Sequence, residues 1–437
     1  MNKKYFSVLG LLLIGALSQA QEIKFEEYDL PNGMHVILHQ DNNAPVVTTA
    51  VMYHVGAKDE IDGKSGFAHF FEHLLFEGTE NIKRGEFMKI VSSNGGSNNA
   101  NTSVDRTYYY ESFPSNNLQL GLWLEAERLR HPVINDIGVI TQNDVIKEEK
   151  KLSFDNRPYG NMGQAINEGL FKKHPYKNSL IGKIDDLDSA KLDEFKGFFK
   201  KYYIPNNATL VVAGDIDKAQ TKKLISDYFG TIPKGTPITR NFPKEDPITQ
   251  QTEMTVYDAN IQLPAYGYAY RTPSNKLKDA KVLEMVSSYL SNGKSSVLYK
   301  KLVDDEKKAL VVQGLIAGQE DHSIFAFFAI PQGKTTEATF RADIDAEIKK
   351  MQTTLISEED YQKLQNQFEN QYVNANSNVQ GIAENLATSY VLLGDTNLIN
   401  KGIDIYRSIT REDLRDAAKK YLNTNQRVII NYLPTKK

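Results

Sequence analysis

Short apolar runs separated by turn residues dominate the first half of the chain. Residues 27–38 alternate around Asn32-Gly33, which predicts two strands joined by a tight turn. Further runs have the apolar, β-branched or aromatic content of strands, at residues 46–55, 98–103, 106–112 and 209–212. Apolar residues at helical spacing predict helices beginning near Ser65 and at residues 117–129, 144–154 and 192–202.

The second half of the chain repeats part of this pattern. Lys419-Lys420-Tyr421, a polar turn and an apolar run at 428–430 repeat Lys200-Lys201-Tyr202 and the run at 210–212. The offset is 421 − 202 = 219 residues, about half of the 437-residue chain. A single repeat of this size predicts two homologous domains and not a solenoid.

A change in composition marks the junction between the two repeats. Four prolines punctuate a polar stretch without helical period, at positions 233, 237, 243 and 247. We therefore expect a first domain at residues 21–232, a linker at 233–250 and a second domain at 251–437.

The first 20 residues have the pattern of a secretory signal peptide. Lys3 and Lys4 precede an apolar run from Val8 to Leu17, and Ser18-Gln19-Ala20 is a small-residue cleavage site. This run is too short for a spanning helix. Residues 1–20 thus predict export, to the periplasm of a bacterium.

Net charge and cysteine content limit the kinds of molecule that the chain is expected to bind. The formal net charge is −3, charged residues make up 24%, and the chain has no cysteine. Without a basic excess or a block of like charge, nothing points to nucleic acid or to a membrane surface. Without cysteine there is neither a lipoprotein anchor nor a disulfide, so we expect no membrane anchor and a fold that rests on its apolar cores.

The candidate chemistry lies in one short segment, His69-Phe70-Phe71-Glu72-His73. His69 and His73 are four residues apart, so in a helix both imidazoles leave the same face. Two such imidazoles are suitable zinc ligands. The carboxylate of Glu72, beside them, is placed to take a proton from an attacking water molecule.

Other interpretations of this segment have to be weighed. A single histidine on an apolar helix face is usually a hydrogen-bonded core residue, but here two of only eight histidines have ligand spacing with a glutamate between them. Several acidic residues could supply a third ligand, and spacing alone does not choose among them. The second half has a single histidine, His322, so the chemistry belongs to the first half.

The segment from Gly66 to Thr79 resembles the metal-binding helix of the pitrilysin and insulinase family of inverzincin metallopeptidases. Further landmarks follow in family order: Asn99-Ala100-x-Thr102, Thr107-x-Tyr109, Val145-Ile146-Lys147-Glu148-Glu149, His174-Pro175-Tyr176 with Ile181-Gly182, and Tyr203-Ile204-Pro205-Asn206-Asn207-Ala208. The length and the single duplication are similar to the short members, such as the β subunit of mitochondrial processing peptidase.

The resemblance implies a fold and a set of roles. The fold is α+β, with two homologous domains of antiparallel-rich sheets and packed helices that form half of a clamshell. His69, His73 and Glu149 would bind one Zn²⁺ per chain, and Glu72 would be the general base of a zinc endopeptidase. Asn99 and Ala100 match the edge strand to which an extended, unstructured peptide adds as an extra strand.

Two departures from the family pattern matter. Where the family often has a carboxylate that supports the zinc site, seven residues before the third ligand, this chain has Gln142. The family's substrate-holding arginine and tyrosine are missing from the second half, since the best alignment places Asp305 and Val312 there. This suggests a heterodimer in which a homologous subunit without zinc supplies the Arg/Tyr pair, with a homodimer as another possibility. The alternative from a different class is a non-catalytic assembly or scaffold subunit.

Overall fold

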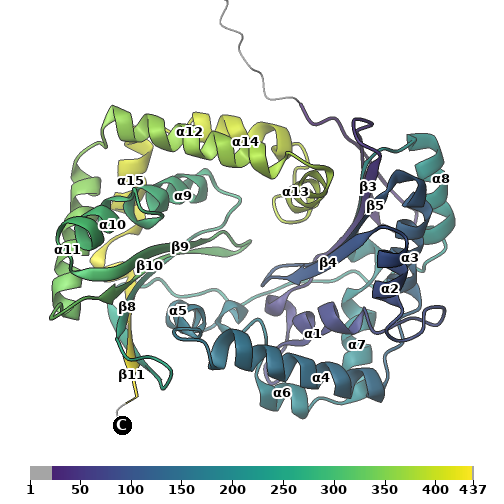
Figure 1. The fold of residues 1–437 in the computed structure, drawn as a ribbon, viewed down its shortest axis with the longest axis horizontal. Coiled ribbons are helices and arrows are strands. Elements are labelled where there is room, and N and C mark those ends of the chain that lie inside the picture. The colour runs from purple at the N-terminus through teal and green to yellow at the C-terminus, as the bar shows by residue number, and fades with distance from the viewer. Residues whose placement is uncertain (1–21, 436–437) are drawn as a thin grey trace, which may run out of the picture.

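The computed structural model describes residues 22–435, which form two α+β domains side by side (Figure 1). The predicted leader, residues 1–20, lies outside the described residues. The first sheet has the order β1-β2-β6-β3-β5-β4 and the second β7-β11-β8-β10-β9. The strands of the first sheet are β1 (Glu26–Asp29), β2 (His35–Gln40), β3 (Val46–Tyr53), β4 (Ser97–Thr102), β5 (Thr107–Pro114) and β6 (Ala208–Gly214). Those of the second are β7 (Thr252–Asp258), β8 (Ala265–Pro273), β9 (Ala309–Ala317), β10 (His322–Pro331) and β11 (Arg427–Pro434).

The two sheets share one topology, which confirms the predicted fold class. In each, one pair is parallel, β2 with β6 and β7 with β11, and the other neighbours are antiparallel. Among the strands within residues 22–435, only β1 has no counterpart in the second sheet. The duplication inferred from the chain sequence is therefore visible strand by strand.

Helices cover these sheets in both domains. The first domain contains α1 (Phe67–Leu74), α2 (Phe87–Ser93), α3 (Leu118–Arg130), α4 (Asp136–Lys150), α5 (Met162–Leu170), α6 (Ile184–Asp188), α7 (Leu192–Tyr202) and α8 (Lys218–Phe229). The second contains α9 (Lys278–Ser291), α10 (Val297–Tyr299), α11 (Glu337–Thr353), α12 (Glu358–Ala375), α13 (Val379–Val391), α14 (Leu398–Arg407) and α15 (Arg411–Tyr421). No helix within residues 22–435 is long and apolar enough to cross a membrane.

One helix boundary differs from the expectation. The helix expected at 144–154 begins at Asp136, because Asn135 caps it by accepting a hydrogen bond from the Gly138 N–H (2.9 Å). After Lys150 the chain continues as a short π-helix, residues 151–155. Exposed Ile137 and Ile140 break the amphipathic pattern that would have revealed the first two turns.

A helix of each domain packs on the sheet of the other domain. Helix α13 of the second domain packs on β3 and β6, where Leu386 joins a buried cluster with Met52 and Val211. Helix α5 of the first domain packs in turn on β8 and β11, where Ile166 joins a buried cluster with Ile430. Each sheet therefore buries apolar surface under a helix of the other domain, which joins the two domains into one unit.

The segment 233–249 contains no helix or strand, yet it is held at several points. Arg240 pairs with Asp59 of the first domain at 2.7 Å. Glu245 accepts hydrogen bonds from three backbone N–H groups at residues 172–174 and pairs with Arg271 on β8 at 3.0 Å. This connection thus follows the junction and contacts both domains.

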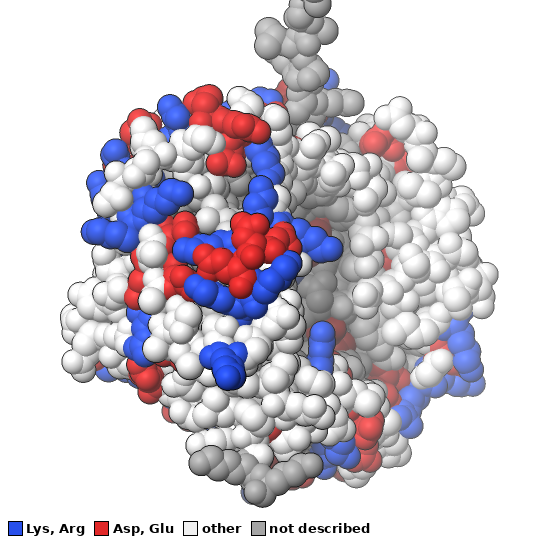
Figure 2. Space-filling model, turned by 60° about the vertical axis from the view of Figure 1, so that its left-hand side comes forward, with Lys and Arg blue, Asp and Glu red and all other residues white. Residues whose placement is uncertain are grey.

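Charged side chains on the face of the second domain that Figure 2 brings forward are intermixed, acidic beside basic. Ion pairs of this domain include Lys301 with Glu347 at 2.9 Å and Lys308 with Asp343 at 2.7 Å. Such pairs lie near solvent, so each adds little to stability.

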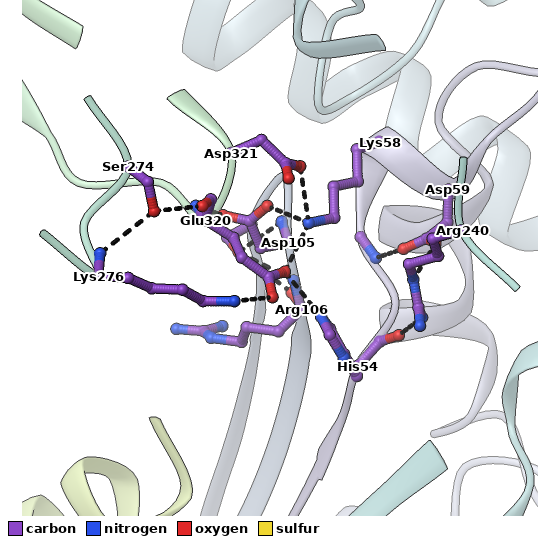
Figure 3. Close-up of polar contacts among 12 residues, drawn as sticks. His54, Lys58, Asp59, Asp105, Arg106, Arg240, Ser274, Lys276, Glu320 and Asp321 are labelled. Atoms are coloured by element: carbon purple, nitrogen blue, oxygen red, sulfur yellow. Dashed lines mark hydrogen bonds and ion pairs between the residues drawn. The ribbon is translucent and has the colours of Figure 1, made fainter. Parts of the chain in front are cut away.

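A buried lysine joins the domains more firmly. Lys58 Nζ lies 2.9 Å from Asp105 of the first domain, and 2.6 and 3.2 Å from Glu320 and Asp321 of the second (Figure 3). Burial alone would raise the pKa of Asp321, but His174 and Lys58 outweigh it and lower the pKa to about 2. Its ionised form is therefore stabilised in the folded chain.

We expect this junction to weaken in acid. A carboxyl group whose pKa is lowered on folding stabilises the fold above its unfolded pKa of roughly 4 and loses that contribution as the pH falls toward 2. Asp321→Asn should therefore reduce the fall in urea midpoint between pH 6 and pH 3, relative to the unchanged chain. Asp395→Asn, which breaks an exposed pair with Lys401, is the control. Equal acid sensitivity in all three proteins would contradict this expectation.

Candidate metal centre

Helix α1 carries the His69-x-x-Glu72-His73 segment, and its start is fixed by close contacts. Gly66 precedes it with φ of +90°, and a Cβ there would lie 2.8 Å from the Gly182 Cα. The buried carboxylate of Glu60 accepts hydrogen bonds from the Gly66 and Ala68 N–H groups, at 2.8 and 2.9 Å. By accepting these bonds, Glu60 satisfies N–H groups that have no partner at the start of the helix.

The side of α1 away from the histidines is apolar. Phe67, Phe70 and Phe71 are buried and their rings contact Phe195 on α7, with centroids 4.5 to 6.2 Å apart. Tyr109 on β5 donates a hydrogen bond to the Phe71 carbonyl at 2.9 Å. This packing fixes the rotation of α1, and hence the direction of its polar side chains.

His69, His73 and Glu149 come together, with one donor atom of each within 4.8 Å of the others. Glu149 Oε2 of α4 lies 3.6 Å from His69 Nε2 and 3.3 Å from His73 Nε2. Ligand atoms of a tetrahedral zinc ion with bonds of about 2.0–2.1 Å are roughly 3.3 Å apart, so the arrangement fits zinc. No other group of three histidine or acidic residues in 22–435 has this spacing.

The protonation tendencies of His69 and Glu149 suit metal binding, whereas the raised pKa of His73 favours its protonated form, which must lose a proton to bind a metal. Burial lowers the pKa of His69 to about 4, which leaves its imidazole neutral at pH 7. Burial also acts to lower the pKa of His73, but Glu149 and Glu72 outweigh it and raise this pKa. The hydrogen bond with His73 lowers the pKa of Glu149, so its carboxylate is ionised. One carboxylate and two imidazoles are a familiar ligand set of catalytic zinc.

Glu72 lies outside this group of three, on the same helix. Its Oε2 accepts a hydrogen bond from Thr102 Oγ1 of β4 at 2.7 Å. Burial raises the pKa of Glu72, which makes the carboxylate a stronger proton acceptor. Thr102 was part of a sequence landmark, but its contact with Glu72 could not be inferred from spacing.

Asn99 and Ala100 lie on β4, the outer strand of the first sheet. They pair with Tyr110 and Tyr109 of β5 on one side, and no strand within residues 22–435 pairs with the other side. The Ala100 side chain is buried in the core, whereas Asn99 is exposed and accepts a hydrogen bond from the Ala100 N–H at 2.9 Å. The open edge passes the metal centre, because Thr102 of the same strand contacts Glu72.

Gln142 lies seven residues, about two helical turns, before Glu149 on α4 and is near His73. Its Nε2 donates a hydrogen bond to Glu77, which also pairs with Arg84. The Gln142 Oε1 is buried and has no hydrogen-bond partner of good geometry within residues 22–435, although Gln142 is close enough to His73 to help raise the pKa of that imidazole. A carboxylate is therefore present next to Gln142, that of Glu77. The sequence did not single out Glu77.

We expect Glu77 to orient Gln142. Holding the amide nitrogen leaves Oε1 to face the imidazole as an acceptor, whereas Glu77→Gln would remove this preference. Outer contacts of this kind typically contribute about 10- to 100-fold in metal affinity, and we expect a loss at the lower end, about tenfold. Competition with a chromogenic zinc chelator measures it, and Arg84→Met, which removes only the exposed partner of Glu77, is the control. Unchanged affinity in Glu77→Gln would show that Gln142 is oriented without it.

The fold and the cluster define a class of protein, a two-domain α+β fold with one candidate metal centre within residues 22–435. Residues 35–183 match the family model described as "Insulinase (Peptidase family M16)", and residues 189–368 match "Peptidase M16 inactive domain". A "Zinc protease PqqE" from Helicobacter pylori is 30% identical over 99% of this chain and 100% of its own length. This chain belongs to peptidase family M16.

Solved structures agree with this assignment. A protease from Helicobacter pylori has a TM-score of 0.90 at 28% identity, covering 94% of this chain and 100% of its own. The periplasmic protease PqqL from Escherichia coli has a TM-score of 0.75 at 19% identity, covering 94% of this chain but 48% of its own. At that identity PqqL shows only the fold, in which one chain of the present length corresponds to about half of a longer one.

Proposed function

We propose that this chain is an exported zinc-dependent endopeptidase that hydrolyses unstructured peptides. The observation that carries the proposal is the convergence of His69, His73 and Glu149, at ligand separations, beside Glu72. Membership of family M16 supports a metallopeptidase. The three residues would hold one Zn²⁺, and Glu72 would be the general base.

In this mechanism each residue of the site has a defined task. Zinc, when bound, polarises the peptide carbonyl and lowers the pKa of water. Glu72 accepts the proton of the attacking water and passes it to the leaving amine. Thr102 holds the Glu72 carboxylate at 2.7 Å, which limits its rotation during both transfers.

The open edge of β4 supports binding of an extended peptide. Main-chain groups at Asn99 and Ala100 would pair with the substrate as with a seventh strand. Because main-chain hydrogen bonds carry little sequence information, conformation would be selected more than sequence. Unfolded peptides are therefore the proposed substrates.

A partner subunit is part of the proposal. No arginine lies between Arg271 and Arg341 and no tyrosine between Tyr299 and Tyr361, so the second half lacks the family's Arg/Tyr pair. Losing groups that hold the oxyanion can cost about 10²–10³ in kcat. We propose that a homologous subunit without zinc supplies them in a heterodimer, with a homodimer as the other arrangement.

The remaining parts of the proposal concern organisation and location. Residues 1–20 would be removed on export to the bacterial periplasm, leaving domains at 21–232 and 251–437 joined by 233–250. The alternative function is a non-catalytic assembly or scaffold subunit. The match of residues 189–368 to the model described as "Peptidase M16 inactive domain" is compatible with this alternative. The two functions differ in their need for zinc.

The deciding experiment is zinc-dependent cleavage of a quenched, unstructured peptide pool by the purified chain beginning at Gln21. Turnover that is lost on chelation and restored by zinc would establish the peptidase without a partner. One zinc per chain without turnover would point to the missing subunit. A chain that binds no zinc would support the scaffold function.

A further inference from the structure

The turn between β4 and β5, residues 103–106, connects the open edge strand to the rest of the first sheet. The Ala57 and Lys58 N–H groups donate to the Ser103 and Val104 carbonyls, at 3.2 and 2.9 Å. Gly56 lies so close that a Cβ there would be 2.5 Å from the Ser103 carbonyl oxygen. The turn is thus clamped from the first domain along its backbone.

Asp105, within this turn, is bound by both domains. Its side chain is 3% exposed, and Oδ1 accepts from Tyr176 OH at 2.6 Å and pairs with Lys58 at 2.9 Å. Its Oδ2 accepts a hydrogen bond from the backbone N–H of Glu320, in the β9–β10 turn, at 3.0 Å. The position of Asp105 therefore depends on the second domain.

The side chain of Glu320 completes this contact (Figure 3). Its Oε2 lies 2.6 Å from Lys58 Nζ and 2.8 Å from His54 Nε2, both of the first domain. Its Oε1 lies 2.9 Å from Lys276, within its own domain. With Lys58 at 1% exposure and Glu320 at 11%, water screens these charges weakly.

The same turn is connected to the metal centre. Arg106 Nη1 donates to the Asn101 carbonyl of β4 at 2.9 Å, and Nη2 pairs with Glu384 of α13 at 3.4 Å. The next residue of β4, Thr102, holds Glu72. The second domain thus reaches the edge strand by two routes, one through Glu320 and one through Glu384.

We infer that Glu320 and Glu384 are positioning residues, through which the domain without a metal site fixes β4 and the Thr102–Glu72 contact. They act through Lys58, Asp105 and Arg106 and do not touch the reacting atoms. The functional part of this inference rests on the proposed peptidase activity. Its structural part, control of β4 by the second domain, stands without that activity.

The test compares Glu320→Gln with Lys276→Gln, which removes only the outer pair of the same carboxylate inside the second domain. Hydrogen exchange of the backbone amides at 97–106 should become about tenfold faster in Glu320→Gln and remain unchanged in Lys276→Gln. The KM for an extended peptide should rise several-fold, while zinc affinity, set by His69, His73 and Glu149, should stay within twofold.

A second variant keeps the test decisive if Glu320→Gln does not fold. Glu384→Gln breaks only the exposed end of the Arg106 route and should also speed exchange in β4. Unchanged exchange at 97–106 in the folded variants would overturn the inference. If the unchanged chain neither binds zinc nor cleaves peptide, the proposed function fails, but faster exchange in the variants would still establish the positioning.

Discussion

Glu72→Gln is expected to lower kcat for peptide hydrolysis by about 10²–10⁴-fold, the usual contribution of a general base. The amide is close in size to the carboxylate and can still accept from Thr102, so the surrounding structure should remain. What it cannot do is accept a proton from the attacking water. Steady-state kinetics with a quenched peptide, at equal zinc loading, measures the effect.

Two controls separate loss of the base from loss of the site. Zinc affinity of Glu72→Gln should equal that of the unchanged chain, because Glu72 lies outside the group of three ligand residues. Thr102→Val removes only the 2.7 Å hydrogen bond to Glu72 and should cost less, about tenfold in kcat, by loosening the base. Turnover retained in Glu72→Gln would mean that another group accepts the proton.

The pair His69 and His73 could be predicted from sequence because one helix places both. Four-residue spacing fixes their common direction, whatever the rest of the chain does. The third candidate ligand, Glu149, could not be predicted in this way, because it lies 76 residues beyond His73 and on another helix. Spacing leaves many acidic candidates at that distance, so this role depended on the family resemblance.

The duplication could be predicted from the sequence, but the packing of α5 and α13 on the sheet of the other domain could not. Repeated apolar patterns reveal two similar domains, and the shared strand order confirms them. An apolar face on α5 or α13 shows only that the helix is buried, not against which sheet. Long-range packing decides this, because it places Leu386 in one buried cluster with Val211 and Ile166 in another with Ile430.

Polar contacts between distant segments were the feature least predictable from the sequence. Lys58 is separated by more than 260 residues from Glu320, and its 1% exposure is unusual for a lysine. Glu77 and Thr102 likewise act through Gln142 and Glu72 across different elements. The positions of such pairs follow no period along the sequence, so they can be identified only in the folded structure.

The second large effect is expected at the third ligand. Glu149→Gln should weaken zinc binding by more than the 10- to 100-fold typical of an outer contact, because it replaces a charged ligand with a neutral one. The neighbouring Glu148→Gln should leave affinity unchanged. Glu148 is 60% exposed and pairs with Lys151 at 3.4 Å, and one residue along a helix turns the side chain by about 100°.

Chelator competition on the two variants, supported by zinc-dependent thermal shifts, therefore tests the ligand assignment without any substrate. Both variants lose one negative charge from the same helix, so a long-range electrostatic effect on zinc would appear equally in both. A loss confined to Glu149→Gln requires direct contact with the ion. Equal losses would contradict the assignment, and unchanged affinity in both would mean that zinc, if bound, is held by other residues, which would also remove the geometric basis of the proposed peptidase.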